Sequence, residues 1–391
     1  MKAVTRPLGR DVDLNGFARG DGFLFVRDGV GLAGRGEAAR VSFAEAPAAL
    51  AAIERDDDVG QPGCGPVAIG VRPFRPGCRS ELVIPAVVIG KGPDGERWLT
   101  TVGDVEADLE PPPVPPPTAG SFAVCPGVPV ATYLAAVVAG RDAVRAGRLT
   151  KVVIARDVLV EADQPLDVHA ILLRLRATFG SSYRYSIGGF VGASPELLVA
   201  RHGDVVRSHP LAGTAPRTGD PSGDARLAAA LIASTKDQVE HRVVIDVVHE
   251  TLLPWCSYLD WEAEPSIVTV ANVQHLGTLI EGRLSSPAPN VLELVEALSP
   301  TPALGGHPRA EALELIAAVE GFDRGRYGGA VGWVDAEGNG TWAVAIRCAE
   351  IEGVRARLFA GGGIVADSDP HAELAETQAK FQAMLSAIVR P

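Results

Sequence analysis

Short apolar runs separated by turn residues recur along this chain, and they limit the fold more than any other feature of the sequence. Such runs lie at residues 22–26, 68–71, 82–89, 151–156, 187–193 and 356–360. They have the length and composition of β-strands, and Pro85 places one of them at a sheet edge or at a bulge. Two further runs, at 328–334 and 340–347, flank a short turn, which predicts a β-hairpin.

Helix-like segments are interleaved with these strands. Apolar spacing predicts helices over residues 128–147 and 226–253. A third helix is expected after Asp369, which can cap its first turn. Its buried face would consist of Leu374, Phe381, Leu385 and Ile388. Antiparallel strands with inserted helices favour an α+β fold over a doubly wound parallel sheet.

A proline-rich tract at residues 111–117 interrupts the chain. Such a tract is stiff and extended, so it continues neither a helix nor a central strand. We therefore divide the sequence into an N-terminal part at 1–110, a connector at 111–119 and a main region at 120–391. The boundary is one of organisation and does not by itself separate two domains.

Composition and charge narrow the possible functions. The 391 residues carry 36 Lys and Arg against 48 Asp and Glu, which gives a formal net charge of −12. A nucleic-acid-coating surface shows a basic stripe instead, so we expect no nucleic acid partner. No run approaches the roughly 18 apolar residues of a membrane helix, and the N-terminus lacks an apolar signal core. The five cysteines are scattered without paired spacing, which predicts a reducing, cytoplasmic environment.

Common cofactor and hydrolase motifs are missing from the sequence. It contains neither a glycine-rich dinucleotide fingerprint nor a Walker loop. His249 and Glu250 begin an HExxH pattern that lacks its second histidine, and Ser194 lacks the closing glycine of a nucleophile elbow. These gaps disfavour nucleotide-dependent, zinc-protease and esterase functions.

Charged side chains gather on the expected C-terminal helix. Glu373, Glu376 and Lys380 share one face, next to the apolar face. Taken alone, this face also fits a solvated surface with a Glu–Lys ion pair. The helix follows glycines 361–363, which we expect to form a turn whose N–H groups are open to a carboxylate or a phosphate.

A second pair of acidic residues lies on the helix predicted at 226–253. Asp237 and Glu240 share a face there, beside a stripe expected to pack inward. That stripe consists of Val239, Val243 and Val247. Two glutamates from different helices, together with an anionic ligand, would suit Mg²⁺, which prefers few carboxylates and several waters.

Two smaller features also point to an anionic ligand. A proline-bracketed loop at 208–217 can present the Thr214 hydroxyl and backbone N–H groups, although it also fits a tight structural loop. Arg347 closes a strand. A lone strand arginine is usually a surface residue, but one aimed at the glycine turn can grip a carboxylate with two hydrogen bonds.

Together these pieces resemble the chorismate-utilising enzymes: isochorismate synthase, salicylate synthase, anthranilate synthase component I and aminodeoxychorismate synthase component I. The matching stretches are 192–198, 210–214, 236–241, 273–276, 300–306, 326–329, 345–347, 360–364 and 368–380. They follow one another through residues 120–391, whereas the N-terminal part matches loosely. The resemblance implies one α+β domain, in which two large, mostly antiparallel sheets pack face to face, are wrapped by helices and hold the site between them.

The same resemblance implies a site for chorismate and Mg²⁺. Glu240 and Glu376 would hold the metal ion, and Glu373 would join through water. The remaining residues would bind the substrate and come from several segments: Gly213, Thr214, His275, Tyr327, Arg347, Gly361, Gly362, Gly363 and Lys380.

Members of this family displace the C4 hydroxyl of chorismate while a nucleophile adds at C2, which requires an acid and a base on opposite faces. Glu196 resembles the general acid, and burial among apolar strands should raise its pKa as that role requires. Water-using members have a lysine where Lys151 opens its strand. Lys151 must be neutral to act as the base, so we expect burial or nearby positive charge, although a strand-opening lysine is elsewhere more often an edge residue.

We therefore predict a Mg²⁺-dependent isochorismate synthase, an isomerase acting on chorismate. Ammonia-using members lack the lysine at position 151, and Ala212 stands where one type of aminodeoxychorismate synthase has a nucleophilic lysine. The alternative is salicylate synthase, which then eliminates pyruvate in the same site. A non-catalytic chorismate-binding protein is an alternative from another class. We expect a cytoplasmic monomer without nucleic acid or membrane partners, whose product serves siderophore, menaquinone or salicylate formation.

Overall fold

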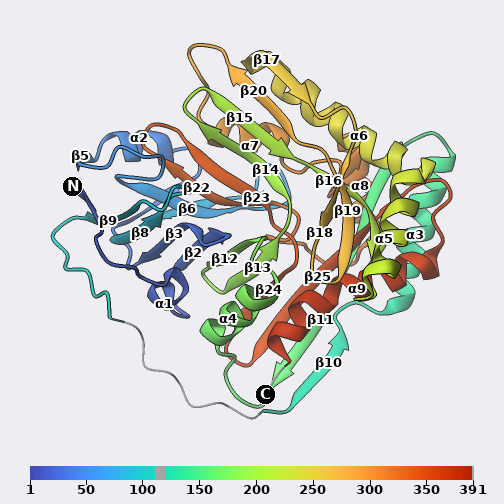
Figure 1. Cartoon of the computed structure of the whole chain (residues 1–391). Coiled ribbons are helices and arrows are strands. Elements are labelled where there is room, and N and C mark those ends of the chain that lie inside the picture. Colours follow the sequence, from blue (N-terminus) through green and yellow to red (C-terminus); the bar gives the residue numbers. More distant parts are fainter. Residues whose placement is uncertain (111–119, 390–391) are drawn as a thin grey trace.

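The computed structural model describes residues 1–110 and 120–389, which form two large sheets, a small third sheet and surrounding helices (Figure 1). The larger sheet contains β1 (Lys2–Pro7), β2 (Phe23–Arg27), β3 (Val30–Arg35), β5 (Glu54–Asp57), β8 (Val87–Lys91), β9 (Arg97–Val102), β10 (Phe122–Pro126), β11 (Lys151–Ala162), β12 (Tyr183–Ile187), β13 (Phe190–Ser194), β21 (Gly306–His307), β24 (Cys348–Glu352) and β25 (Arg355–Ile364). Its order is β10-β11-β25-β24-β13-β12-β2-β3-β8-β9-β1-β5, and β21 pairs with β11.

The second sheet contains β4 (Ala39–Ser42), β6 (Val67–Arg72), β7 (Glu81–Ile84), β14 (Leu197–His202), β15 (Val205–His209), β17 (Cys256–Trp261), β20 (Ile280–Leu284), β22 (Ala330–Asp335) and β23 (Gly340–Val344). Its order is β17-β20-β15-β14-β23-β22-β6-β7-β4. The third sheet, in the order β16-β19-β18, consists of β16 (Leu211–Pro216), β18 (Ser266–Thr269) and β19 (Val273–Gly277). Both large sheets combine strands from residues 1–110 with strands from residues 120–389.

The helices lie around the sheets, with several of them gathered beside β11 and β25 (Figure 1). They are α1 (Leu14–Ala18), α2 (Ala46–Ala51), α3 (Val130–Arg145), α4 (Val168–Thr178), α5 (Pro221–Ala233), α6 (Thr235–Leu252), α7 (Val291–Leu298), α8 (Arg309–Val319) and α9 (Pro370–Ile388), with a 3₁₀ turn at Leu253–Trp255. The Asp369 side chain caps α9 by accepting from the backbone N–H groups of His371 and Ala372.

The packing confirms the predicted α+β class. One cluster of buried side chains joins Phe25 and Leu32 of the larger sheet to Ile69 and Trp342 of the second sheet. Among the strand pairs that the structure describes, β1 and β5 are parallel and the others are antiparallel. The hairpin predicted at 328–347 is formed by β22 and β23. Because the two large sheets share a core, burial of apolar surface stabilises them together.

Two predicted strands are divided in the structure. The run at 82–89 breaks at Pro85, so that β7 joins the second sheet and β8 joins the larger one. Proline lacks the N–H that a continuous strand would donate, and the chain changes sheets there. The run at 187–193 bends at Gly188 and Gly189, whose positive φ angles form the turn between β12 and β13.

The helix predicted at 226–253 is also divided. Ser234 ends α5 and caps α6, since its hydroxyl accepts from the Asp237 N–H. The predicted valine stripe is wrong, because Val239 is 58% exposed. The face of α6 that packs inward instead carries His241, Val244, Ile245, Val248 and Leu252. The predicted stripe used only valines four positions apart. A buried helix face instead combines spacings of three and four positions, as from His241 to Val244 and from Val244 to Val248.

Two further sequence predictions concern the proline-rich tract and membrane-spanning segments. The proline-rich tract lies outside the described residues. Within the described residues, no helix combines the length and apolar character needed to span a membrane.

Candidate active site

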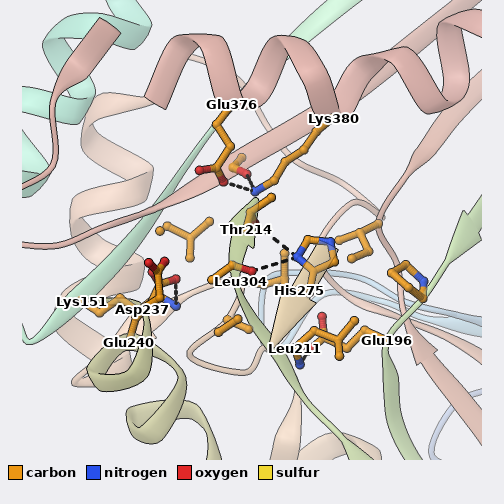
Figure 2. Close-up of a pocket in the computed structure, with 18 of the residues that line it drawn as sticks. Lys151, Glu196, Leu211, Thr214, Asp237, Glu240, His275, Leu304, Glu376 and Lys380 are labelled. Atoms are coloured by element: carbon orange, nitrogen blue, oxygen red, sulfur yellow. Dashed lines mark hydrogen bonds and ion pairs between the residues drawn. The ribbon is translucent and has the colours of Figure 1, made fainter. Parts of the chain in front are cut away.

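A cavity lies between the sheets and the helices α6 and α9, and most of the predicted site residues line it (Figure 2). These are Lys151, Glu196, Gly213, Thr214, Glu240, His275, Tyr327, Arg347, Gly361, Gly363, Glu373, Glu376 and Lys380. Gly362 is outside the cavity lining. In Figure 2, Lys151 and Glu240 lie on one side of the labelled residues and Glu196 lies on the other, with His275 between them.

Lys151 is the first residue of β11 and is almost fully buried. Its Nζ atom donates to Oε1 of Glu240 over 2.7 Å. Burial is as expected, but the charge beside this lysine is negative rather than positive. Lys151 and Glu240 thus form a buried ion pair in the cavity lining.

Glu196 lies in the short link between β13 and β14 and is 3% exposed. Its carbonyl oxygen accepts from the Val344 N–H over 3.1 Å, which fixes the backbone. Burial raises the pKa of the Glu196 carboxyl to about 7. The predicted rise is thus confirmed, and the group can hold a proton at neutral pH.

A hydrogen-bonded chain crosses the cavity through His275 on β19. Its Nδ1 atom lies 3.0 Å from the Gly213 carbonyl oxygen, which only accepts, so Nδ1 carries the proton. Nε2 then accepts from Nη2 of Arg347 over 3.1 Å. Burial, followed by the Arg347 charge, lowers the pKa of His275 to about 3. The imidazole is therefore neutral and orients the Arg347 guanidinium.

Arg347 has a backbone conformation that its side chain rarely adopts. It follows β23 with a φ of 52°, in the left-handed region, which costs about 1–3 kcal/mol outside glycine. Its Nε atom has no hydrogen-bond partner among the described residues. A buried, unpaired guanidinium N–H beside the cavity is suited to an anionic ligand. No pattern in the sequence indicates this strained backbone.

Glycines 361–363 form part of β25 and do not make the predicted turn. The opposite residues Val153 and Ala155 direct their N–H groups away from β25, to the Gly305 carbonyl and to Glu320. The paired residues, Gly363 and Gly361, therefore also direct their backbone groups away from β11. Within the described residues, β24 pairs with β25 only as far as Leu358, so this edge is open beside the cavity.

The missing side chains of these glycines leave room for the charged groups. A Cβ atom on Gly363 would lie 2.5 Å from Oε1 of Glu240, and one on Gly362 would lie 2.6 Å from Oε2 of Glu373. Gly362 alternates with its neighbours and is paired with Ile154 in the ladder. This alternation explains why it is absent from the cavity lining.

Three glutamates from α6 and α9 lie close to the glycines of β25. Lys380 binds Oε1 of Glu376 over 2.6 Å and also donates to the Gly361 carbonyl over 2.8 Å. Burial, followed by the nearby Glu376 charge, raises the pKa of Glu373 to about 7. Among the described residues, no three metal-binding side chains are grouped as ligands. Lysines or a proton neutralise these carboxylates. Their hard oxygen donors, and the space left by the glycines of β25, fit a divalent cation.

Two charged lining residues were not among the predicted site residues. Lys236 and Asp237 open α6 beside Glu240. Nζ of Lys236 lies 3.9 Å from Oε1 of Glu373 across the gap between α6 and α9. Burial raises the pKa of Asp237. Lys236 precedes Glu240 by four positions and Asp237 by three, so the three residues share one face of the helix. This helical spacing is the sequence signal that identifies them.

Comparison with known proteins defines the class to which this fold and site belong. The family model described as chorismate binding enzyme matches residues 104–389. The chain therefore belongs to the chorismate-binding enzyme family, as the sequence resemblance predicted.

Individual relatives are similar over most of their length. A Mycobacterium tuberculosis protein named "Putative isochorismate synthase MenF" is 42% identical over 343 residues, which are 83% of this chain and 87% of that protein. Isochorismate synthase DhbC of Bacillus subtilis is 38% identical over 83% of this chain and 81% of its own. A crystal structure of a "putative 2,3-dihydroxybenzoate-specific isochorismate synthase, DhbC" from Bacillus anthracis has a TM-score of 0.81 and 32% identity, covering 96% of this chain and 98% of that one.

Proposed function

We propose that this chain is an isochorismate synthase, an isomerase that interconverts chorismate and isochorismate. The observation that carries the proposal is one cavity with a buried lysine, Lys151, on one side and a buried carboxyl with a raised pKa, Glu196, on the other. An acid and a base on opposite sides are what water addition and hydroxide loss require. The relatives named isochorismate synthase support the same reaction.

In the proposed reaction, neutral Lys151 removes a proton from water as the water oxygen bonds to C2. The ring double bonds shift and the C4–O bond breaks. Glu196 gives its proton to the departing hydroxyl, which leaves as water. Water is therefore both consumed and released, and solvent restores the original protonation of the two side chains.

The substrate's carboxylates would be bound by charge and by backbone donors. Arg347 offers its unpaired Nε–H, and Lys380 also lines the cavity. The N–H groups of Gly361 and Gly363 face the open edge of β25. The neutral His275 holds Arg347 in place. The donors are arranged before the ligand arrives, which reduces the ordering cost of binding.

We further propose that the enzyme uses Mg²⁺. Glu240 and Glu376 would hold the ion, and Glu373 would join through water. The support is the closeness of three carboxylates to the glycines of β25 and the fit of their oxygen donors to this cation. When bound, the ion supplies positive charge to a substrate carboxylate.

The test is to identify the products formed by the full chain. The protein is incubated with chorismate and Mg²⁺, and the mixture is resolved by chromatography. We expect an equilibrium mixture of chorismate and isochorismate, reached from either compound. Salicylate as the main product at neutral pH would replace this function with salicylate synthase. Anthranilate formed with ammonium would contradict water addition, and Mg²⁺-dependent binding without turnover would indicate a binding protein.

A further inference from the structure

One edge of β11 has a gap in its strand pairing next to the cavity. On this edge, β21 pairs with Lys151 and Val152, and β10 begins pairing only at Val158. Within the gap, Glu320 accepts the Ala155 N–H over 2.8 Å. Nη2 of Arg324 donates to the Val153 carbonyl over 2.7 Å. An ion pair between two side chains thus replaces the missing strand.

Arg324 and Glu320 are both buried, with exposed fractions of 2% and 3%. Glu320 ends α8, and Nε of Arg324 donates to its Oε2 over 2.9 Å. The guanidinium carbon lies 4.2 Å from the ring centre of Phe74 and 5.8 Å from that of Tyr327. Neighbouring aromatic faces attract the cation and hold its plane. The pair is therefore anchored by both charge and stacking.

The same arginine also holds a second wall of the cavity. Its Nη1 donates to the Leu304 carbonyl over 2.8 Å. Val153, Leu304 and Tyr327 all line the cavity, whereas Arg324 does not. One rigid guanidinium fork therefore connects β11, the loop before β21 and the Tyr327 ring. Its influence on a bound ligand passes through these three residues.

We propose that Arg324, with Glu320 as its counter-ion, is a positioning residue for the proposed isochorismate synthase reaction. It fixes the wall formed by Val153, Leu304 and Tyr327, and this wall sets where the substrate ring lies between Lys151 and Glu196. The inference rests on the proposed function. Misplacing a reacting group by about 1 Å can cost about 100-fold in rate, so the expected effect is on kcat.

The chain offers a matched control in a second arginine of the same kind. Arg72 is 7% exposed, binds both carboxylate oxygens of Glu296 and donates to the Cys78 carbonyl over 3.0 Å. It also lies over the Phe43 ring at 5.7 Å. None of these four residues lines the cavity. Its loss disturbs an ion pair with a half-exposed carboxylate and leaves the proposed ring wall in place.

The experiment compares Arg324→Lys with Arg72→Lys in the full chain, by kinetics with chorismate and Mg²⁺ and by melting temperature. A lysine keeps the charge but cannot reproduce the fixed fork that reaches both carbonyls and Glu320. We expect both variants to lose melting temperature, with the smaller loss in Arg72→Lys because its partner Glu296 is half exposed. Arg324→Lys should lower kcat at least 10-fold with KM within about threefold of wild type, while Arg72→Lys keeps both constants within twofold.

A kcat for Arg324→Lys within twofold of wild type would overturn the proposal, and so would an equal loss in Arg72→Lys. If Arg324→Lys does not fold, Glu320→Gln decides, since glutamine keeps the shape and an acceptor for the Ala155 N–H. It should lower kcat about threefold or more, and an unchanged kcat would overturn the proposal. An inactive wild type would instead overturn the proposed function itself, which separates the two failures.

Discussion

The two sides of the cavity are stabilised by different kinds of interaction. On the side of β14 and β19, Glu196 carries a raised pKa and His275 is neutral, so the contacts are mainly hydrogen bonds within a buried network. On the side of α6 and α9, Glu240 and Glu376 are each bound to a lysine. Hydrogen bonds hold the side chains on the first side, and ion pairs hold those on the second.

The two sides of the cavity should therefore respond differently to added ions. We expect the hydrogen-bonded side to keep its arrangement when a metal ion binds, because the partners of His275 are a backbone carbonyl and a guanidinium. On the charged side, a cation or a substrate carboxylate would compete for the partners of the ion pairs. We therefore expect substitutions of the charged side's glutamates to alter the metal dependence, and substitutions on the other side to leave the metal dependence unchanged.

The largest effect is expected from Lys151→Ala, which removes the proposed base. General base catalysis contributes about 10²–10⁴-fold, so kcat should fall by roughly 10³-fold or more. Chorismate binding should be largely kept, because Arg347 and the β25 edge remain. Steady-state kinetics and calorimetry measure the two quantities. Lys91→Ala is the control, since its partner Asp11 lies at the surface. Full activity in Lys151→Ala would remove this lysine from the mechanism.

Glu196→Gln should reduce kcat by about 10²–10³-fold, because glutamine cannot give a proton to the leaving hydroxyl. The pKa of Glu196 is raised to about 7, so the acid form is present below that pH and is lost as the pH rises. Wild-type kcat should carry a limb that falls above about pH 7. The variant should lack this limb. A wild-type limb that persists unchanged in Glu196→Gln would assign it to another group.

Gly363→Ala tests whether the open edge of β25 must be free of side chains. The new Cβ would lie 2.5 Å from Oε1 of Glu240 and 2.8 Å from Cε of Lys151, so both groups must move. We expect a loss of about 10- to 100-fold in kcat/KM. Gly9→Ala is the matched control, because no atom lies within 4 Å of its added Cβ. Equal activity in the two variants would contradict the close approach.

The smallest effect concerns stability and Mg²⁺. The pKa of Glu373 is raised from 4.5 to about 7 in the folded protein. Its protonated form therefore favours folding below about pH 4.5, and this contribution, at most about 3 kcal/mol, is lost as the pH rises through about 7. A cation should relieve the charged state, so Mg²⁺ should raise the melting temperature by more at pH 8 than at pH 5.5.

Calorimetric or fluorescence melts with Mg²⁺ and with a chelator measure this difference. Glu373→Gln should make the Mg²⁺ effect nearly independent of pH, because glutamine does not titrate. Chelation should also abolish turnover, and added Mg²⁺ should restore it. A Mg²⁺ shift that is the same at both pH values in the wild type would show that Glu373 does not sense the ion.

The sequence predicted the family, the fold class and the residues that meet in the cavity, because paired strands and ordered motifs carry that information. It did not predict where continuous runs divide. Residues 82–89 are apolar throughout, and only the tertiary structure assigns β7 and β8 to different sheets. Ser234 was a capping signal, but apolar spacing on both sides of it concealed the break between α5 and α6.

Glycines 361–363 show a different limit. Glycine is usual in turns, so local propensity favoured a turn. Their place in β25 is explained by Glu240 and Glu373, which come from distant helices and occupy the space of a side chain. Similarly, the charge beside Lys151 comes from α6, and no local pattern around residue 151 indicates its sign. Such features depend on contacts between remote segments.

The open edge of β25 limits how the ligand specificity of this pocket can change during evolution. Its donors are main-chain N–H groups, which every residue except proline provides. Exchange for any residue other than proline therefore leaves the donors themselves in place, although a side chain at Gly363 would crowd the space beside them. New specificity in such a pocket has to arise on its other walls.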